Sequence, residues 1–219
     1  ATTEIYTLSL HDALPIYGTL AEVLHLHGQV QGLHPMHRLP LASLAFPALR
    51  RQPRQLLQDF AANLDRLIAA DGQVNLQEYC LAKLVGIQVI DALDPAATLV
   101  IGRLKLGQVK VELCALFSIV AAYGHDDAQG ARRAFLQGMN ELGVQETMDC
   151  APPLDWALAL DRALPRLNQL APAGKELVVR GLTQAISADG LLNVAEAELL
   201  RTVCAALHCP LPPILQRSP

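Results

Sequence analysis

One nine-residue pattern, Ala-Asp-Gly-x-x-Asn-x-x-Glu, occurs twice in this chain, at Ala70–Glu78 and at Ala188–Glu196. In both places, apolar residues at helical spacing stand before the pattern and again after it. The pattern therefore predicts a hinge between two helices, at two distant points of the chain.

Each polar residue of the hinge has a predicted structural role. The glycine stands where a helix ends and the chain needs a positive φ. Asn75 and Asn193 are predicted N-caps, and Glu78 and Glu196, three residues later, complete capping boxes. The two copies lie 118 residues apart, far more than a solenoid repeat, so we interpret them as two halves of one pseudo-duplicated helical domain.

The composition favours an all-α fold. Hydrophobic residues make up 52% of the chain but aromatic residues only 4%, so the apolar content is mostly Leu, Ala and Val, as in packed helices. The net charge of −4 shows no basic excess, which argues against nucleic-acid binding. We expect about seven or eight helices.

We divide the chain into three parts. Residues 1–16 resemble the in-frame translation of a sequencing adapter, so we exclude them from the fold and expect that the native protein extends further upstream. Residues 17–52 are predicted to be a linker with one or two short helices, interrupted at Pro47. Residues 53–216 are predicted to form the helical domain. Its helices are expected at 53–70, 76–93, 104–123, 126–142, 154–170, 173–188 and 194–207.

The cysteines show no Cys-x-x-Cys spacing and lie mostly within apolar helical patterns, so we expect reduced, buried thiols. They are Cys80, Cys114, Cys150, Cys204 and Cys209. The uncharged segment Leu113–Gly124 is too short to span a bilayer and is predicted to be a buried core helix, so the chain itself is expected to be soluble.

The acidic residues of the hinges have two interpretations. As oxygen ligands they could hold a divalent cation, and as cap and turn residues they need no ion. They are Asp71, Glu78, Asp189 and Glu196. The EF-hand pattern is missing, because its glycine position is Leu76 or Val194 and its bidentate acid position is Ala82 or Leu200.

The amino-terminal histidines also have two interpretations, as a zinc site or as solvated side chains. They are His25, His27, His34 and His37. Arginines at 50, 51 and 54 form either a solvated face or a contact with an anionic membrane surface. Trp156 is expected to anchor the core. The sequence holds no His-Glu-x-x-His, Gly-x-Ser-x-Gly or Walker motif, so we assign no catalytic residue to it.

Parts of this chain resemble two known protein families. The doubled hinge resembles the paired acidic hinges of TerB-like tellurite-resistance domains, which are all-helical and pseudo-duplicated. Segments Leu39–Arg50, Asp65–Leu84 and Glu198–Leu215 resemble the carboxy-terminal region of bacterial HtpX-like membrane zinc metalloendopeptidases. That resemblance implies a parent whose catalytic zinc domain and transmembrane helices lie upstream. It also implies that this chain, as part of the parent, lies on the cytoplasmic side of the bacterial inner membrane.

Two hypotheses remain open. In the first, the chain is a non-catalytic accessory domain of such a metalloendopeptidase, with zinc only in the parent and the upstream protease domain or another protein as its partner. In the second, it is a free-standing TerB-like module that binds a divalent ion or a partner in a stress response.

Overall fold

The computed structural model describes residues 17–68, 74–98, 101–143 and 151–213. Residues 1–16 and the predicted Asp71, Gly72 and Cys150 lie outside these ranges. The chain is all-helical, as predicted, and the described ranges contain no β-strand beyond one isolated bridge between Leu104 and Leu170. None of the helices in these ranges is long and apolar enough to cross a membrane.

The chain divides into two compact units at Arg38 and Leu39. In its described part, the first unit contains α2 (Tyr17–Gln31) and the first turn of α3 (Pro35–Leu49). Both Pro40 and Pro47 lie inside α3, although each removes one helical N–H donor. The predicted interruption at Pro47 is therefore wrong, since the helix continues to Leu49.

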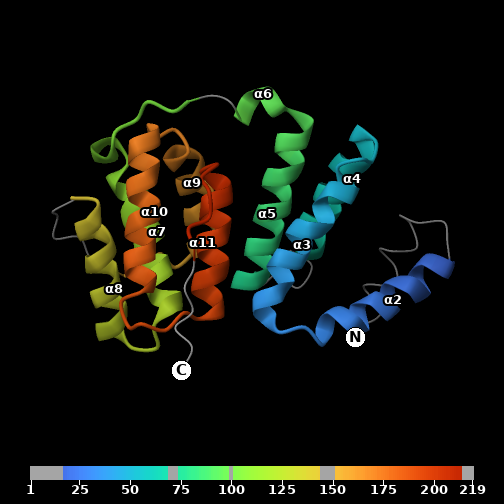
Figure 1. The fold of residues 1–219 in the computed structure, drawn as a ribbon, viewed down its shortest axis with the longest axis horizontal. Coiled ribbons are helices and arrows are strands. Elements are labelled where there is room, and N and C mark those ends of the chain that lie inside the picture. The colour runs from blue at the N-terminus through green and yellow to red at the C-terminus, as the bar shows by residue number, and fades with distance from the viewer. Residues whose placement is uncertain (1–16, 69–73, 99–100, 144–150, 214–219) are drawn as a thin grey trace. The chain divides into compact units, whose positions relative to one another are not determined.

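The second unit holds the remaining helices, at or near the predicted positions (Figure 1). They are α4 (Arg54–Ile68), α5 (Leu76–Leu93), the one-turn α6 (Pro95–Thr98), α7 (Lys110–Gly124), α8 (Ala128–Glu141), α9 (Trp156–Leu167), α10 (Pro172–Ile186) and α11 (Val194–Ala206).

The hydrophobic helix α7 begins six residues later than predicted. Leu104 pairs instead with the loop before α10: its N–H donates to the Gln169 carbonyl at 2.9 Å, and its carbonyl accepts from the Ala171 N–H at 3.0 Å. A short 3-10 turn, η1 (Leu106–Gln108), then leads into α7. Apolar residues occur both in the segment before Lys110 and in α7, so the apolar pattern does not show where α7 begins.

Helix α7 forms the centre of the second unit and packs against α8, α9, α10 and α11 (Figure 1). Its side chains Leu113, Leu116, Phe117 and Ile119 are fully buried. Next to it, the backbones of α8 and α10 lie close together where the two helices cross. A Cβ at Gly181 would lie only 2.8 Å from the Gly138 carbonyl oxygen. Glycine at this crossing lets the two backbones approach.

A second packing group links α3, α4 and α5 through Phe46, Leu57, Val85 and Val89. Helix α5 also packs against α11, so this group joins the helices around α7 (Figure 1). Trp156, the predicted anchor, stands edge-on to the rings of Tyr79 in α5 and Tyr123 in α7, at centroid distances of 5.2 and 5.4 Å.

Candidate functional site

The second hinge, between α10 and α11, has the predicted local geometry. Gly190 has a φ of +78°, where side chains with a Cβ are strained. Asp189 Oδ1 accepts from the Leu191 N–H at 2.8 Å and closes the turn. Asn193 Oδ1 accepts from the Glu196 N–H at 2.9 Å, and Glu196 Oε2 accepts from the Asn193 N–H at 3.0 Å. The predicted capping box is confirmed.

The first hinge carries the same box before α5. Asn75 Oδ1 accepts from the Glu78 N–H at 3.0 Å, and Glu78 Oε2 accepts from the Asn75 N–H at 3.2 Å. Both bonds lie at the exposed surface. Of the two acids predicted here, Glu78 is thus a cap residue, and Asp71 lies outside the described residues.

Glu196 differs from Glu78 because it is buried, with 1% of its surface exposed. Its Oε1 atom has no hydrogen-bond partner among the described residues and rests against Gly124 at the end of α7, where a Cβ would lie 2.3 Å from this oxygen. Burial raises the pKa of Glu196 to about 7; the Asn193 N–H opposes this shift, and the negative charge of Asp189 adds to it.

A histidine that the sequence analysis did not single out completes the site. His125 follows α7, and its side chain is only 5% exposed. Its Nδ1 atom lies 3.3 Å from the Ala121 carbonyl oxygen. In the part of the chain that the structure describes, its Nε2 atom has no hydrogen-bond partner, and it lies 4.0 Å from Asp189 Oδ2.

The cap residue itself joins the hinge to α7. Asn193 Nδ2 donates to the Gly124 carbonyl oxygen at 2.8 Å, in addition to the cap bond that its oxygen accepts. The hinge is therefore fixed on the carboxy-terminal end of α7, which brings His125 beside Asp189 and Gly124 against Glu196. More than sixty residues separate these partners along the chain, so no local pattern predicts their contact.

This arrangement offers two chemical possibilities. A buried carboxylate oxygen, a buried imidazole nitrogen and a half-exposed carboxylate at one hinge are groups that bind divalent cations. The Glu196 carboxyl group, with its pKa raised to about 7, can also hold and release a proton near neutral pH. In the described ranges, the geometry brings no three His, Cys, Asp or Glu side chains close enough to form a metal-binding group.

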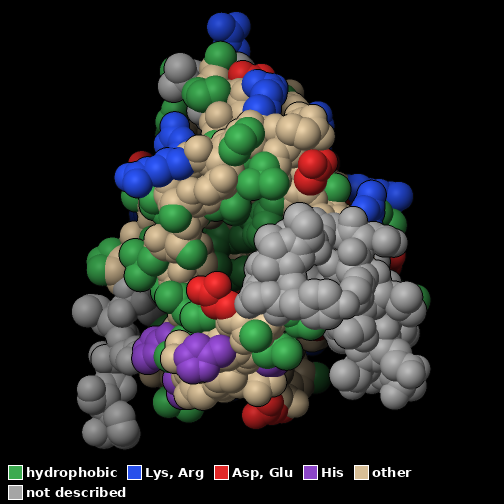
Figure 2. Space-filling view, turned by 90° about the vertical axis from the view of Figure 1, so that its right-hand side faces the viewer, with side chains coloured by type: hydrophobic (Ala, Val, Ile, Leu, Met, Phe, Trp, Pro, Cys, Tyr) green, Lys and Arg blue, Asp and Glu red, His purple; other side chains and the backbone are tan. Residues whose placement is uncertain are grey.

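The other predicted candidates lie elsewhere. All four amino-terminal histidines are exposed, and Figure 2 shows several histidine side chains at the molecular surface. His25 and His27 each contact a glutamine side chain one turn later, at 3.2 and 2.8 Å. In the arginine cluster, Arg54 Nη1 donates to the Leu93 carbonyl oxygen at 3.1 Å and so completes the end of α5.

Three of the predicted buried thiols are confirmed: Cys80, Cys114 and Cys204 are buried, and Cys80 and Cys204 carry free thiols. Cys209 is also free but half-buried. Cys150 lies outside the described residues.

No family model, no curated protein and no solved structure matches this chain.

Proposed function

We propose that the chain is a non-catalytic helical accessory domain of a membrane-embedded zinc metalloendopeptidase, which regulates or assembles the enzyme or presents its substrates. The observation that carries this proposal is the packing of the three segments that resemble the HtpX-like carboxy-terminal region. They lie in α3, in α4 and α5, and in α11, and these helices contact one another in turn. The resemblance thus covers one contiguous part of the fold.

The contacts within this part are apolar and buried. Phe46 from the first segment and Leu57 of α4 pack on Val85 and Val89 of α5, beside the second segment. On another face of α5, Cys80 and Leu84 lie in the same core cluster as Leu199, Leu200, Val203 and Cys204 of α11. An accessory domain needs such a core of its own.

Two measurements test this proposal. Sequencing the source DNA across the codon for Tyr17 should reveal hydrophobic spans and a His-Glu-x-x-His motif upstream in the same frame. The purified chain should not cleave an unfolded protein substrate. A start codon directly before Tyr17 would contradict the parent enzyme, and cleavage that a zinc chelator abolishes would contradict the non-catalytic role.

A second candidate function, binding of a divalent ion as in the TerB-like hypothesis, is favoured by one observation at the second hinge. Glu196 Oε1 and His125 Nε2 are both buried without a hydrogen-bond partner among the described residues, and Asp189 Oδ2 stands 4.0 Å from the histidine. Unpartnered buried polar atoms are costly. Since the described side chains do not already form a metal-binding group, a cation that satisfied both atoms would have to draw the hinge side chains together.

Thermal unfolding with and without divalent ions tests this second candidate. Because an ion that binds only the folded state stabilises it, one of Zn²⁺, Mn²⁺, Ca²⁺ or Mg²⁺ at millimolar concentration should raise the melting temperature. Glu196→Gln should abolish the increase, and the matched Glu78→Gln at the other hinge should keep it. An unchanged melting temperature with all four ions would rule out this ion site.

A further inference from the structure

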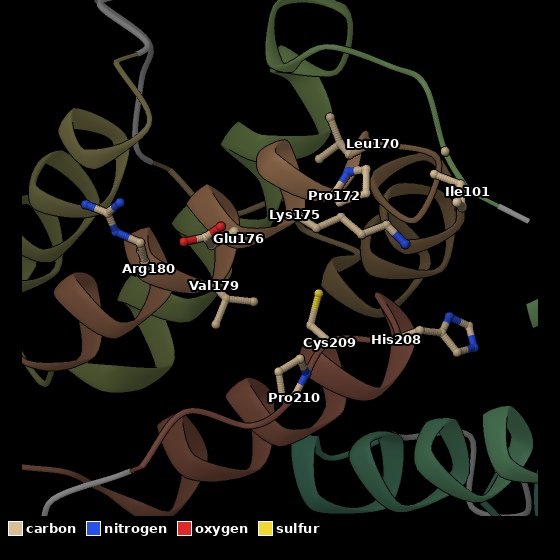
Figure 3. Close-up of a pocket in the computed structure, with 11 residues that line it drawn as sticks. Ile101, Leu170, Pro172, Lys175, Glu176, Val179, Arg180, His208, Cys209 and Pro210 are labelled. Carbon is tan, nitrogen blue, oxygen red and sulfur yellow. The ribbon is translucent and has the colours of Figure 1, made fainter. Parts of the chain in front are cut away.

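A cavity of about 510 Å³ opens beside α10 (Figure 3), and the residues that line it are not those of the second hinge. Its walls come from the start of α10, the loop before it, the segment at 101–102 and the chain that follows α11. Most of the lining is apolar and includes Leu170, Pro172, Val179, Cys209 and Pro210. This volume lies within the usual range for small-molecule sites, roughly 300–1,000 Å³.

The wall after α11 is fixed by an unusual backbone conformation. His208 has a φ of +54°, in the left-handed region that favours glycine. The turn is closed by the Cys209 N–H, which donates to the Cys204 carbonyl at 2.9 Å, and by the His208 ring, whose Nε2 lies 3.1 Å from Asp91 Oδ1. This turn places Cys209 and Pro210 on the cavity.

The opposite wall is tied to the core. Leu104 pairs with the backbone around Leu170 through two hydrogen bonds. Gly102 lies so close to this backbone that a Cβ there would meet the Gln169 oxygen at 2.3 Å. The two walls are therefore held in place without any ligand, as in preformed binding sites.

Lys175 supplies a positive charge at one end of the cavity. Its Nζ atom donates to Asn168 Oδ1 at 2.6 Å and to the Leu207 carbonyl oxygen at 2.9 Å, and both acceptors are neutral. An ammonium group carries three donors, and hydrogen bonds to the described residues use two of them, so one remains for another acceptor. Burial lowers the pKa of Lys175, since the charged form loses hydration. An anion at Nζ would compensate this loss.

The other charged residues at the cavity differ from Lys175 in position or pairing. Arg180 is paired with Glu141. Glu176 extends away from Lys175, toward the side where Arg180 lies (Figure 3). The end of the cavity at Lys175 thus combines a half-buried positive charge with apolar walls.

We propose that this cavity binds a small amphipathic carboxylate, an alkyl chain that ends in one carboxylate group. The carboxylate accepts the remaining N–H of Lys175, and the alkyl chain lies along Leu170, Val179 and Pro210. A charge-assisted hydrogen bond sets the orientation, and burial of the alkyl chain supplies the affinity.

Titration calorimetry with decanoate and decanol tests the proposal. Decanoate should bind more tightly than decanol, and Lys175→Met should weaken decanoate binding by roughly ten- to a hundredfold while it leaves decanol binding unchanged. The matched control is Lys83→Met, whose ammonium already pairs with Asp161 at 2.7 Å, and this variant should bind decanoate like the unaltered chain. Equal binding of decanoate and decanol would overturn the proposal.

A second variant covers the case in which Lys175→Met does not fold, since Lys175 also bonds Asn168 and Leu207. Val179→Phe keeps the lysine and fills the cavity, so it should abolish decanoate binding. Bound decanoate should also slow the reaction of iodoacetamide with the half-buried Cys209. Peptide mass spectrometry measures the rate of this alkylation.

A third experiment distinguishes an alkyl carboxylate from the carboxy-terminus of an apolar peptide. A tetrapeptide that ends in a free leucine carboxylate should bind more weakly than decanoate, because its amide groups have few partners among the apolar walls. Tighter binding of the peptide, or decanoate binding by Val179→Phe, would contradict the proposal of an alkyl ligand.

Discussion

The two hinges share one sequence pattern and one capping box, yet their environments differ. At the first hinge, the cap bonds of Asn75 and Glu78 are exposed. At the second, Glu196 is buried against Gly124, and Asn193 also bonds the end of α7. Local sequence therefore sets the hinge geometry, whereas contacts with distant helices set the chemistry of its acid.

The helices that follow the hinges show the same contrast. The polar contacts between α5 and α9 are partly exposed, and in them Lys83 Nζ and the Tyr79 hydroxyl both donate to Asp161 Oδ1. Both hinge helices bury apolar side chains, such as Leu84 in α5 and Leu199 in α11, but α11 also buries the carboxyl group of Glu196. Equivalent substitutions at the two hinges should therefore differ in size, and the following predictions test this difference.

The largest expected difference concerns pH. The pKa of Glu196 is raised from its ordinary value of 4.5 to about 7 in the folded state, so the folded chain holds this proton more tightly than the unfolded chain. The stabilisation is complete below pH 4.5 and is lost as the pH rises through about 7, at up to about 1.4 kcal/mol per pH unit. The free energy of unfolding should be measured by urea titration at several pH values between 4.5 and 8, with Trp156 fluorescence as the signal and EDTA present.

Glu196→Gln should remove this part of the pH dependence, and Glu78→Gln serves as the matched control at the first hinge. Asp189, whose charge adds to the shift, and His125, which lies 4.0 Å from Asp189 Oδ2, stay intact in both variants. If Glu196→Gln leaves the slope of stability against pH unchanged, the pKa of the Glu196 carboxyl group is not raised in the folded chain.

The next prediction compares the two cap residues. Asn193→Ala should lower the free energy of unfolding by about 1–3 kcal/mol, because it removes both a cap and the bond to the Gly124 carbonyl. Asn75→Ala removes only a cap and should cost about 0.5–2 kcal/mol. Urea unfolding of both variants gives the comparison, and a larger loss for Asn75→Ala would reverse it.

A pair of glycines tests the close contact at the second hinge. Gly124→Ala should destabilise the chain by about 1–2 kcal/mol, since its Cβ would meet Glu196 Oε1 and Cδ. Gly86→Ala, on α5, has no atom within 4 Å of the new Cβ and should stabilise the helix by about 0.5–1 kcal/mol. Thermal melts of the two variants should therefore shift in opposite directions; shifts of the same sign would contradict the contact.

These pairs of residues also show how much of the fold and of the candidate site the sequence predicts. The helix ends around Asn75, Asn193 and Gly190 depend on interactions within a few residues, and their prediction is confirmed. The approach of His125 to Asp189 depends on how α7 packs against the second hinge, and no local signal reports that packing. The cavity at Lys175 could not be predicted for the same reason, because its walls come from three separate segments of the chain.

The smallest effect is expected at the exposed contact of α5. Lys83→Met should lower the free energy of unfolding by about 0.2–1 kcal/mol, because the Lys83–Asp161 pair is partly exposed and water screens its charges. The Tyr79 hydroxyl still donates to Asp161 in this variant, so the carboxylate keeps a partner. High salt should remove most of the difference between the two proteins, since it screens an exposed pair. A loss above about 2 kcal/mol that persists in 1 M salt would mean that the first hinge helix is held as firmly by buried electrostatics as the second, and that the contrast between the hinges is limited to Glu196.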